Sequence, residues 1–188
     1  MVKQQQSQNV EMVSVKPKIQ FRQSNRSADF ITGVDEENSP QRFINRGKLL
    51  HEVFSAISTK EDIEQAIDRL VFEGVIGSKV EEQEVKALTE HALTLPEVQD
   101  WYSGRWKLFN ECDIIWMEHD ELKKRRPDRV MQHNNELVVV DFKFGQPQEK
   151  YHRQVQGYMN LLRGMMGNEN KAISGYLWYV DNDKIERV

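Results

Sequence analysis

The stretch that decides the fold is Leu137-Val138-Val139-Val140-Asp141-Phe142-Lys143. Its first four residues are uniformly apolar, which is typical of a strand buried on both faces of a sheet. Side chains alternate along a strand, so Asp141 and Lys143 point the same way and Phe142 points oppositely. A carboxylate and an ammonium group at the end of a buried strand could bind a divalent metal and hold a water beside it. The alternative is an exposed strand end with a surface ion pair, because short motifs recur by chance.

A second carboxylate precedes this strand. Pro127-Asp128 lies thirteen residues before Asp141, across a predicted hairpin. If the two strands pair, Asp128 lies beside Asp141. Two carboxylates together with waters suit Mg²⁺, a hard cation that prefers oxygen ligands. The alternative is a turn aspartate after a proline, which is common in loops.

The residues around this core alternate between helical and strand patterns. In 41–58, Leu50, Val53, Phe54 and Ile57 follow helical spacing. The further predicted helices span 59–71, 79–94, 96–101 and 149–166, and the predicted strands span 107–117, 129–131, 137–140 and 173–180. This order predicts an α/β fold, with a central mixed β-sheet flanked by helices and an N-terminal helical segment.

The length of 188 residues fits one domain of ordinary size. The start of the chain is rich in Gln, Ser and Asn, and residues 1–38 are therefore interpreted as an N-terminal tail, extended arm or linker. Ser39 suits the N-cap of a helix and Pro40 its first turn. We place the folded domain at residues 39–188.

Composition excludes several classes of protein. With 30 acidic and 26 basic residues the formal net charge is -4, which argues against coating nucleic acid by bulk electrostatics but allows a local basic groove. The single cysteine, Cys112, excludes a four-cysteine zinc site or iron–sulfur cluster within the chain. No apolar run is long enough to span a membrane, and the start lacks the apolar segment of a signal peptide. We expect a cytoplasmic protein without a membrane partner.

Three further groups are candidate functional residues. Gln154 and Tyr158 lie within about 40° of each other on the predicted helix and could offer an amide and a phenol to substrate; alternatively, Tyr158 is core and Gln154 is solvated. His51 sits at the edge of an apolar stripe, where a histidine is usually a core or boundary residue. A dense basic run could contact DNA phosphates, or could be a solvated hairpin loop. The run consists of Lys123, Lys124, Arg125 and Arg126, with Arg129 nearby.

Together these pieces resemble a known family. Pro127-Asp128 followed by Asp141-Phe142-Lys143 resembles the signature of the PD-(D/E)XK nuclease superfamily. Two pieces are similar to its RecB-type exonuclease branch: the Gly-x-x-x-His pattern that ends at His51, and the Gln-x-x-x-Tyr pattern that ends at Tyr158. Glu111 occupies the place of an acidic residue often found on the preceding strand. The resemblance covers about residues 39–188.

The resemblance implies a restriction-endonuclease-like fold and a Mg²⁺-dependent exodeoxyribonuclease that hydrolyses phosphodiester bonds. Mn²⁺ is expected to substitute for Mg²⁺, and no iron–sulfur cluster is expected. The implied metal ligands are His51, Asp128, Asp141 and the Phe142 backbone carbonyl, with Glu111 as an auxiliary ligand. Lys143 is expected to position the attacking water, and Gln154 and Tyr158 to orient the scissile phosphate.

In this family the domain is commonly the C-terminal nuclease of a UvrD/Rep-like helicase–nuclease that acts in DNA repair and recombination. The residues contain no phosphate-binding Gly-x-x-x-x-Gly-Lys-Ser/Thr loop, so we expect a helicase motor elsewhere in the parent protein or in a partner subunit. The alternative is a catalytically weak nuclease fold that serves as a DNA-binding or assembly module. A third possibility is a nuclease that acts on RNA.

Overall fold

The computed structural model describes residues 40–188, so the predicted tail at 1–38 and the predicted cap Ser39 lie outside the described residues. The helices are α1 (Pro40–Ala56), α2 (Ile63–Phe72), α3 (Lys79–Ala92), α4 (Pro96–Trp101) and α5 (Glu149–Arg163), with short 3₁₀ turns η2 (Lys60–Asp62) and η3 (Val180–Asn182). The strands are β1 (Lys107–Asn110), β2 (Ile114–Glu118), β3 (Glu121–Arg125), β4 (Arg129–His133), β5 (Glu136–Lys143), β6 (Ala172–Tyr179) and β7 (Lys184–Arg187).

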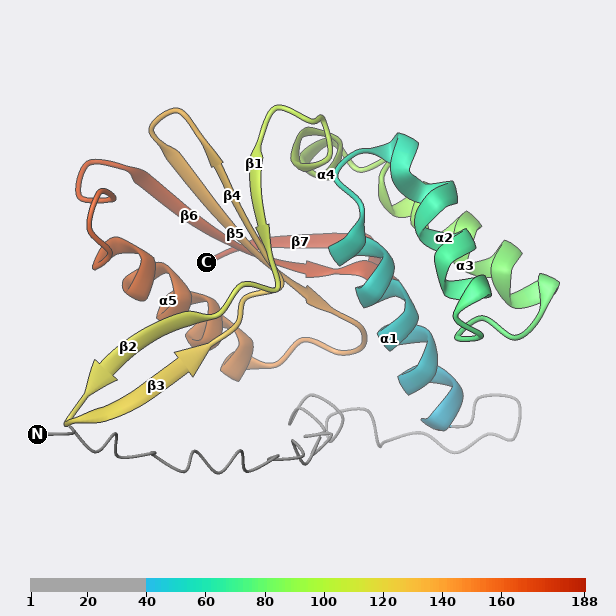
Figure 1. Ribbon diagram of the computed structural model, residues 1–188, viewed down its shortest axis with the longest axis horizontal. Helices are drawn as coiled ribbons and strands as arrows, with labels where there is room; N and C mark the ends of the chain where they lie inside the picture. Colours follow the sequence, from blue (N-terminus) through green and yellow to red (C-terminus); the bar gives the residue numbers. More distant parts are fainter. Residues whose placement is uncertain (1–39) are drawn as a thin grey trace, which may run out of the picture.

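The main sheet has five strands in the order β1-β4-β5-β6-β7 (Figure 1). Strands β5 and β6 pair in parallel, and the other neighbours pair antiparallel. A parallel pair needs a crossover connection, and α5 supplies it. The predicted α/β class with a central mixed sheet flanked by helices is confirmed, and it is consistent with a restriction-endonuclease-like fold.

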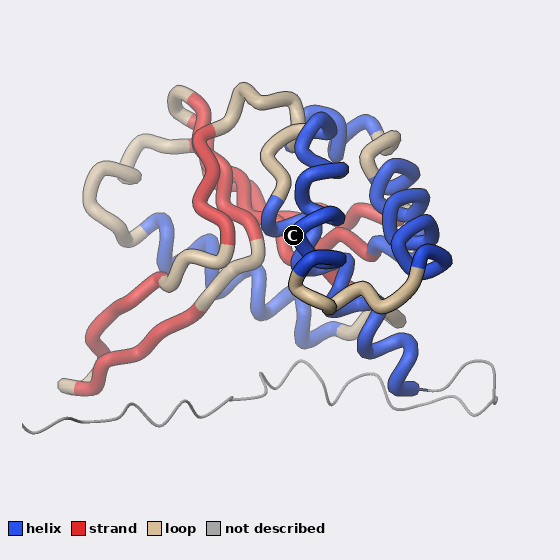
Figure 2. Tube along the Cα trace, turned by 45° about the vertical axis from the view of Figure 1, so that its right-hand side comes forward, coloured by secondary structure: helices blue, strands red, loops and turns tan. Residues whose placement is uncertain are grey.

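The two faces of the sheet carry separate cores, with α5 on one side and α1 to α4 on the other (Figures 1 and 2). From β5, Leu137 and Val139 pack in the cluster that includes α5, whereas Val138, Val140 and Phe142 pack in the cluster that includes α1. The alternation predicted for this strand therefore holds. Both faces are buried, as a uniformly apolar strand requires.

Helix α1 packs its apolar stripe on the sheet. Leu50, Val53, Phe54 and Ile57 are all fully buried, which confirms the helical spacing. Burial of such a side chain contributes roughly 1.5–3 kcal/mol relative to exposure. This packing fixes the helix face that carries His51 against the end of β5, where the His51 and Phe142 ring centroids lie 5.8 Å apart.

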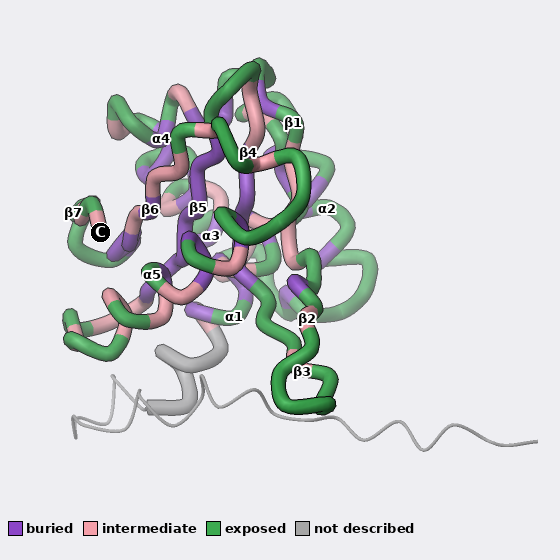
Figure 3. Tube along the Cα trace, turned by 90° about the vertical axis from the view of Figure 1, so that its left-hand side faces the viewer, coloured by how far each residue is buried: buried purple, intermediate pink, exposed green. Residues whose placement is uncertain are grey.

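Residues 107–117 form two strands rather than the single predicted strand, because the chain turns at Glu111, which has a φ of 51°. The second strand, β2, pairs with β3 in a separate two-stranded ribbon that projects from the body of the molecule (Figures 1 and 3). We call this ribbon together with the residue on either side of it, residues 113–126, the arm. The basic run was predicted as a loop or phosphate contact, and its first three residues are strand because β2 pairs with them.

Candidate metal centre and active site

Three side chains from separate segments converge at one end of the sheet. His51 comes from α1, Glu111 follows β1, and Asp128 immediately precedes β4. Nε2 of His51 lies 3.2 Å from Oε1 of Glu111 and 3.1 Å from Oδ1 of Asp128. One ligand atom of each residue lies within 4.8 Å of the other two. An imidazole and two carboxylates are a donor set that fits a divalent cation.

Backbone geometry brings Glu111 to this centre. The left-handed conformation of Glu111 is uncommon for a residue with a side chain, and such conformations concentrate at functional sites. The Glu111 amide donates a 3.1 Å hydrogen bond to the backbone carbonyl of Asp128. Two contacts with α1 complete the placement: Asn110 Nδ2 donates to the Ser55 carbonyl at 2.8 Å, and Ser55 Oγ donates to Glu111 Oε1 at 3.5 Å.

Asp128 is held by the strand that carries the motif. Its side chain is 1% exposed, and its Oδ2 accepts a 2.7 Å hydrogen bond from the backbone amide of Phe142. The other carboxylate oxygen faces His51. Asp128 therefore lies beside the Asp141-Phe142-Lys143 stretch, as predicted. The contact between them is the hydrogen bond from the Phe142 amide. Ligation by the Phe142 carbonyl stays a prediction.

Asp141 and Lys143 lie on the same face of β5, as their spacing indicates. The Asp141 side chain is fully buried and forms an ion pair with Nζ of Lys143. Asp141 is not part of the group formed by His51, Glu111 and Asp128. From the sequence, Asp141 is predicted as a principal metal ligand and Glu111 as an auxiliary one. In the structure, it is Glu111 that lies with His51 and Asp128. The role of Asp141 as a ligand stays a prediction.

A hydrogen-bonded chain leads from Lys143 into α5. Nζ of Lys143 donates to Oε1 of Gln154 at 3.3 Å, and Nε2 of Gln154 donates to the Tyr158 hydroxyl at 2.8 Å. The Tyr158 hydroxyl in turn donates to the Arg126 carbonyl at 3.2 Å. The Lys143 ammonium also lies 4.4 Å from the centre of the Tyr151 ring, a cation–π distance. Tyr158 is buried, as the core interpretation predicts, and its hydroxyl is hydrogen bonded to Gln154. Contact of Gln154 and Tyr158 with substrate stays a prediction.

Most of the basic run is already paired within the arm. Lys123 forms an ion pair with Glu121, and Asp113 lies 3.5 Å from Lys124 and 2.8 Å from Arg126. The hydrogen bond from Arg126 is the largest of the interactions that lower the pKa of Asp113. Exposed pairs of this kind are weak and compete with solvent, so these cations remain available to an anionic partner.

Arg129 was predicted to join the basic run on DNA, and its position contradicts that prediction. It is fully buried, and its guanidinium donates to the carbonyls of Ile57 and Trp101, each at 3.0 Å, and of Phe54 at 3.4 Å. Burial lowers the pKa of Arg129, and it raises the pKa of the adjacent Tyr102 to about 12. Arg129 stacks on the Tyr102 ring at 3.9 Å, and it joins α1, α4 and β4 internally.

Three residues at the site are not among the functional candidates that the sequence patterns indicate. Ser55 lies one helical turn after His51, so its i+4 spacing is a signal that could have found it. Tyr151 lies three residues before Gln154 on the same side of α5, so helical spacing is a signal for it as well. Asn110 carries no such signal. Asn110 acts through its hydrogen bond to the Ser55 carbonyl of α1, a contact that is not local in sequence.

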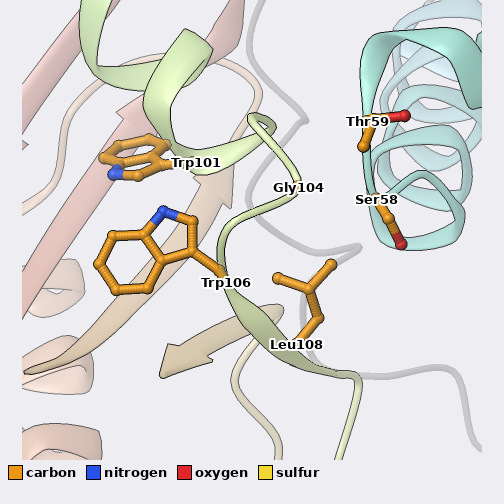
Figure 4. Close-up of a pocket in the computed structure, with 6 residues that line it drawn as sticks. All are labelled: Ser58, Thr59, Trp101, Gly104, Trp106 and Leu108. Atoms are coloured by element: carbon orange, nitrogen blue, oxygen red, sulfur yellow. The ribbon is translucent and has the colours of Figure 1, made fainter. Parts of the chain in front are cut away.

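A separate pocket of about 310 Å³ lies between the end of α1 and β1 (Figure 4). It is lined by Ser58, Thr59, Trp101, Gly104, Trp106 and Leu108. None of these residues belongs to the group of His51, Glu111 and Asp128, so the pocket is distinct from the candidate metal centre. The two tryptophan rings are nearly buried, at 4% and 7% exposed, and their main role is in the core.

Comparison with known proteins identifies a family that matches most of the chain. The family model of the PD-(D/E)XK nuclease superfamily matches residues 27–188. No curated protein is similar enough to count as a match. Among the described residues, no helix combines the length and apolar character needed to cross a membrane.

Proposed function

The chain belongs to the PD-(D/E)XK nuclease superfamily, and from this premise we propose that it is a Mg²⁺-dependent DNA nuclease that hydrolyses phosphodiester bonds. One observation carries the assignment of the site: the donor atoms of His51, Glu111 and Asp128 lie together beside a strand end that bears Asp141 and Lys143. A fold used only as a scaffold has no need of these five groups at one place.

Each residue has a defined task in this proposal. His51, Glu111 and Asp128 would hold the divalent ion, and Asp141 with the Phe142 carbonyl would add ligands from β5. When bound, the ion supplies positive charge that stabilises the transition state and favours deprotonation of water. Mg²⁺ is favoured by the carboxylate oxygens, and Mn²⁺ would substitute because imidazole and carboxylate also suit it.

Lys143 would position the attacking water, because its ammonium group is fixed between Asp141 and Gln154. Its three donors are enough to keep these two contacts and add a third to water. Gln154 and Tyr158 would orient the scissile phosphate from α5. Positioning matters because holding the reactants in the reactive geometry removes much of the barrier.

The finer assignment is a RecB-type exonuclease that acts in DNA repair and recombination in the cytoplasm. It is supported by the Gly47-to-His51 and Gln154-to-Tyr158 patterns, whose members His51, Gln154 and Tyr158 contact the groups described above. A helicase motor elsewhere in the parent protein, or in a partner subunit, would deliver the DNA. The folded domain is proposed as residues 39–188, and the exposed arm cations Lys123, Lys124, Arg125 and Arg126 would contact DNA.

The experiment is a cleavage assay on labelled linear and circular duplex DNA and on single-stranded DNA and RNA, with Mg²⁺, with Mn²⁺ and with excess chelator. We expect metal-dependent degradation of linear DNA. Cleavage of the circle would show endonuclease activity in place of exonuclease activity. DNA binding without cleavage under every condition would instead favour the alternative, a binding or assembly module, and preference for RNA would overturn the assignment of the substrate.

A further inference from the structure

Arg125 differs from the other cations of the basic run. Lys123, Lys124 and Arg126 each have a carboxylate partner in the arm, and Arg129 is buried. In the part of the chain that the structure describes, no carboxylate lies within ion-pair distance of Arg125, whose side chain is exposed. Its guanidinium is 5.9 Å from the centre of the Trp116 ring. Arg125 is therefore a cation whose charge is not neutralised by a carboxylate of the described residues.

The guanidinium of Arg125 rests on helix α5 at Gly157. A Cβ atom at position 157 would come within 2.1 Å of Nη1 of Arg125, so the arginine occupies the space that any other residue would fill. Glycine in the middle of a helix costs roughly 0.5–1 kcal/mol relative to alanine. The chain has a glycine, with its cost in helix stability, at the position of α5 that the Arg125 side chain contacts.

Gly157 places the guanidinium next to the proposed catalytic residues. Because a helix turns about 100° per residue, Gly157 lies about 60° around α5 from Gln154, which contacts Lys143. The adjacent Tyr158 anchors the root of the arm through its hydrogen bond to the Arg126 carbonyl. Arg153, another exposed arginine, lies one turn before Gly157 on the same helix face.

We propose that Arg125 binds a backbone phosphate of the DNA strand next to the phosphate that is cleaved, and that Gly157 exists to seat its guanidinium there. This deepens the proposed function and rests on it. A planar guanidinium matches a phosphate with two parallel N–H donors, which lysine cannot reproduce. The arm would thereby hold the strand in register with the site on α5 and β5.

The test compares two variants with two matched controls. Arg125→Ala removes the cation, and Gly157→Ala keeps it but displaces it, because the colliding atom is the end of a flexible side chain. Arg163→Ala and Gly164→Ala make the same chemical changes near the end of α5, where Arg163 bonds Asn160 and a Cβ at 164 meets only ordinary contacts. Binding of a fluorescein-labelled oligonucleotide is measured in chelator over a range of salt, together with melting temperature and cleavage kinetics.

Arg125→Ala is expected to weaken oligonucleotide binding roughly tenfold and to lower the salt slope by about one phosphate contact. Its KM should rise more than its kcat falls. Gly157→Ala should weaken binding in the same direction while raising the melting temperature by about 2–4 °C, because alanine favours the helix. A merely structural glycine would not combine greater stability with weaker binding.

Equal binding by Arg125→Ala and Arg163→Ala, or unchanged binding by Gly157→Ala, would overturn the proposal even if the wild type cleaves DNA. The same holds if the wild type binds no oligonucleotide at all. If the wild type binds in an Arg125-dependent way but cleaves nothing, the proposed nuclease function fails while the phosphate contact stands. The two failures are therefore distinguishable.

Discussion

The backbone amide of Phe142 donates a 2.7 Å hydrogen bond to Oδ2 of Asp128. This bond joins the end of β5 to the residue before β4, and it directs the second oxygen of the Asp128 carboxylate to His51, 3.1 Å away. The carboxylate is buried and fixed in place. One of its oxygens thus serves the fold, and the other is available to the candidate metal centre.

Replacement of Asp128 by asparagine separates these two tasks. The asparagine oxygen can still accept from the Phe142 amide, which leaves an NH₂ group facing His51 where a ligand oxygen is needed. We expect Asp128→Asn to fold but to lose the stabilisation by Mn²⁺ that the wild type gains, about 2.7 kcal/mol at a hundred times the dissociation constant. Thermal unfolding across a Mn²⁺ titration checks this, with Asp183→Asn, an exposed aspartate paired with His91, as control. Equal shifts in both variants would place the ion elsewhere.

Lys143 is expected to be essential for cleavage and dispensable for binding. Its ammonium group is fixed by Asp141 and Gln154, and a lost catalytic proton-transfer or positioning group typically costs about 10²–10⁴-fold in rate. Lys143→Ala should reduce single-turnover cleavage by that order while oligonucleotide affinity changes little. Lys79→Ala, which removes an exposed lysine paired with Glu82, is the control. Unimpaired cleavage by Lys143→Ala would mean that the active site is misplaced.

Arg129 is expected to act on stability. Arg129→Ala removes the donors of the Phe54, Ile57 and Trp101 carbonyls and leaves a cavity under Tyr102. We expect a loss of about 3 kcal/mol or more in the free energy of unfolding. Urea unfolding measures it, with Arg69→Ala, an exposed arginine that pairs with Glu73 one turn away, expected to be near the wild type. A stable variant with weakened DNA binding would restore Arg129 to the DNA-contacting set.

Asp62 caps the turn between α1 and α2 in a pH-dependent way. Hydrogen bonds from the amides of Thr59, at 2.8 Å, and Ser58, at 2.9 Å, lower its pKa. A lowered folded-state pKa means that the stabilisation is present above the unfolded pKa of about 3.9 and is lost as the pH falls through the folded value. Asp62→Ala should therefore cost about 1 kcal/mol at pH 7, and the difference should shrink in acid.

Urea unfolding at neutral and acidic pH measures this difference. Asp68→Ala on the exposed face of α2 is the control. A gap between the wild type and Asp62→Ala that stays constant with pH would show that the carboxylate charge is not what stabilises the turn.

Local patterns predicted the parts of the molecule that depend on local physics. The apolar run of β5 reports burial on both faces, and the alternation after it places Asp141 with Lys143 because strand geometry is regular. The spacing of Gln154 and Tyr158 likewise predicts a shared helix face, and the two side chains are hydrogen bonded. Each of these relationships spans only a few residues.

The remainder depends on contacts that no local pattern reports. The charge of Arg129 suggested an exposed residue, yet its guanidinium donates hydrogen bonds to three backbone carbonyls from distant segments. Glu111 joins His51 and Asp128 through a left-handed turn whose conformation is set by its neighbours. Strand β3 carries a basic run with one apolar residue, and it is a strand because β2 pairs with it. In each case a tertiary contact overrides the intrinsic preference.

The central claim is that His51, Glu111 and Asp128 together hold a divalent ion, and a crystal of the protein grown with Mn²⁺ tests it most directly. An anomalous difference map should show a peak about 2.0–2.6 Å from Nε2 of His51 and from carboxylate oxygens of Glu111 and Asp128. A map in which these three side chains keep their positions at saturating Mn²⁺ with no peak between them would contradict the claim.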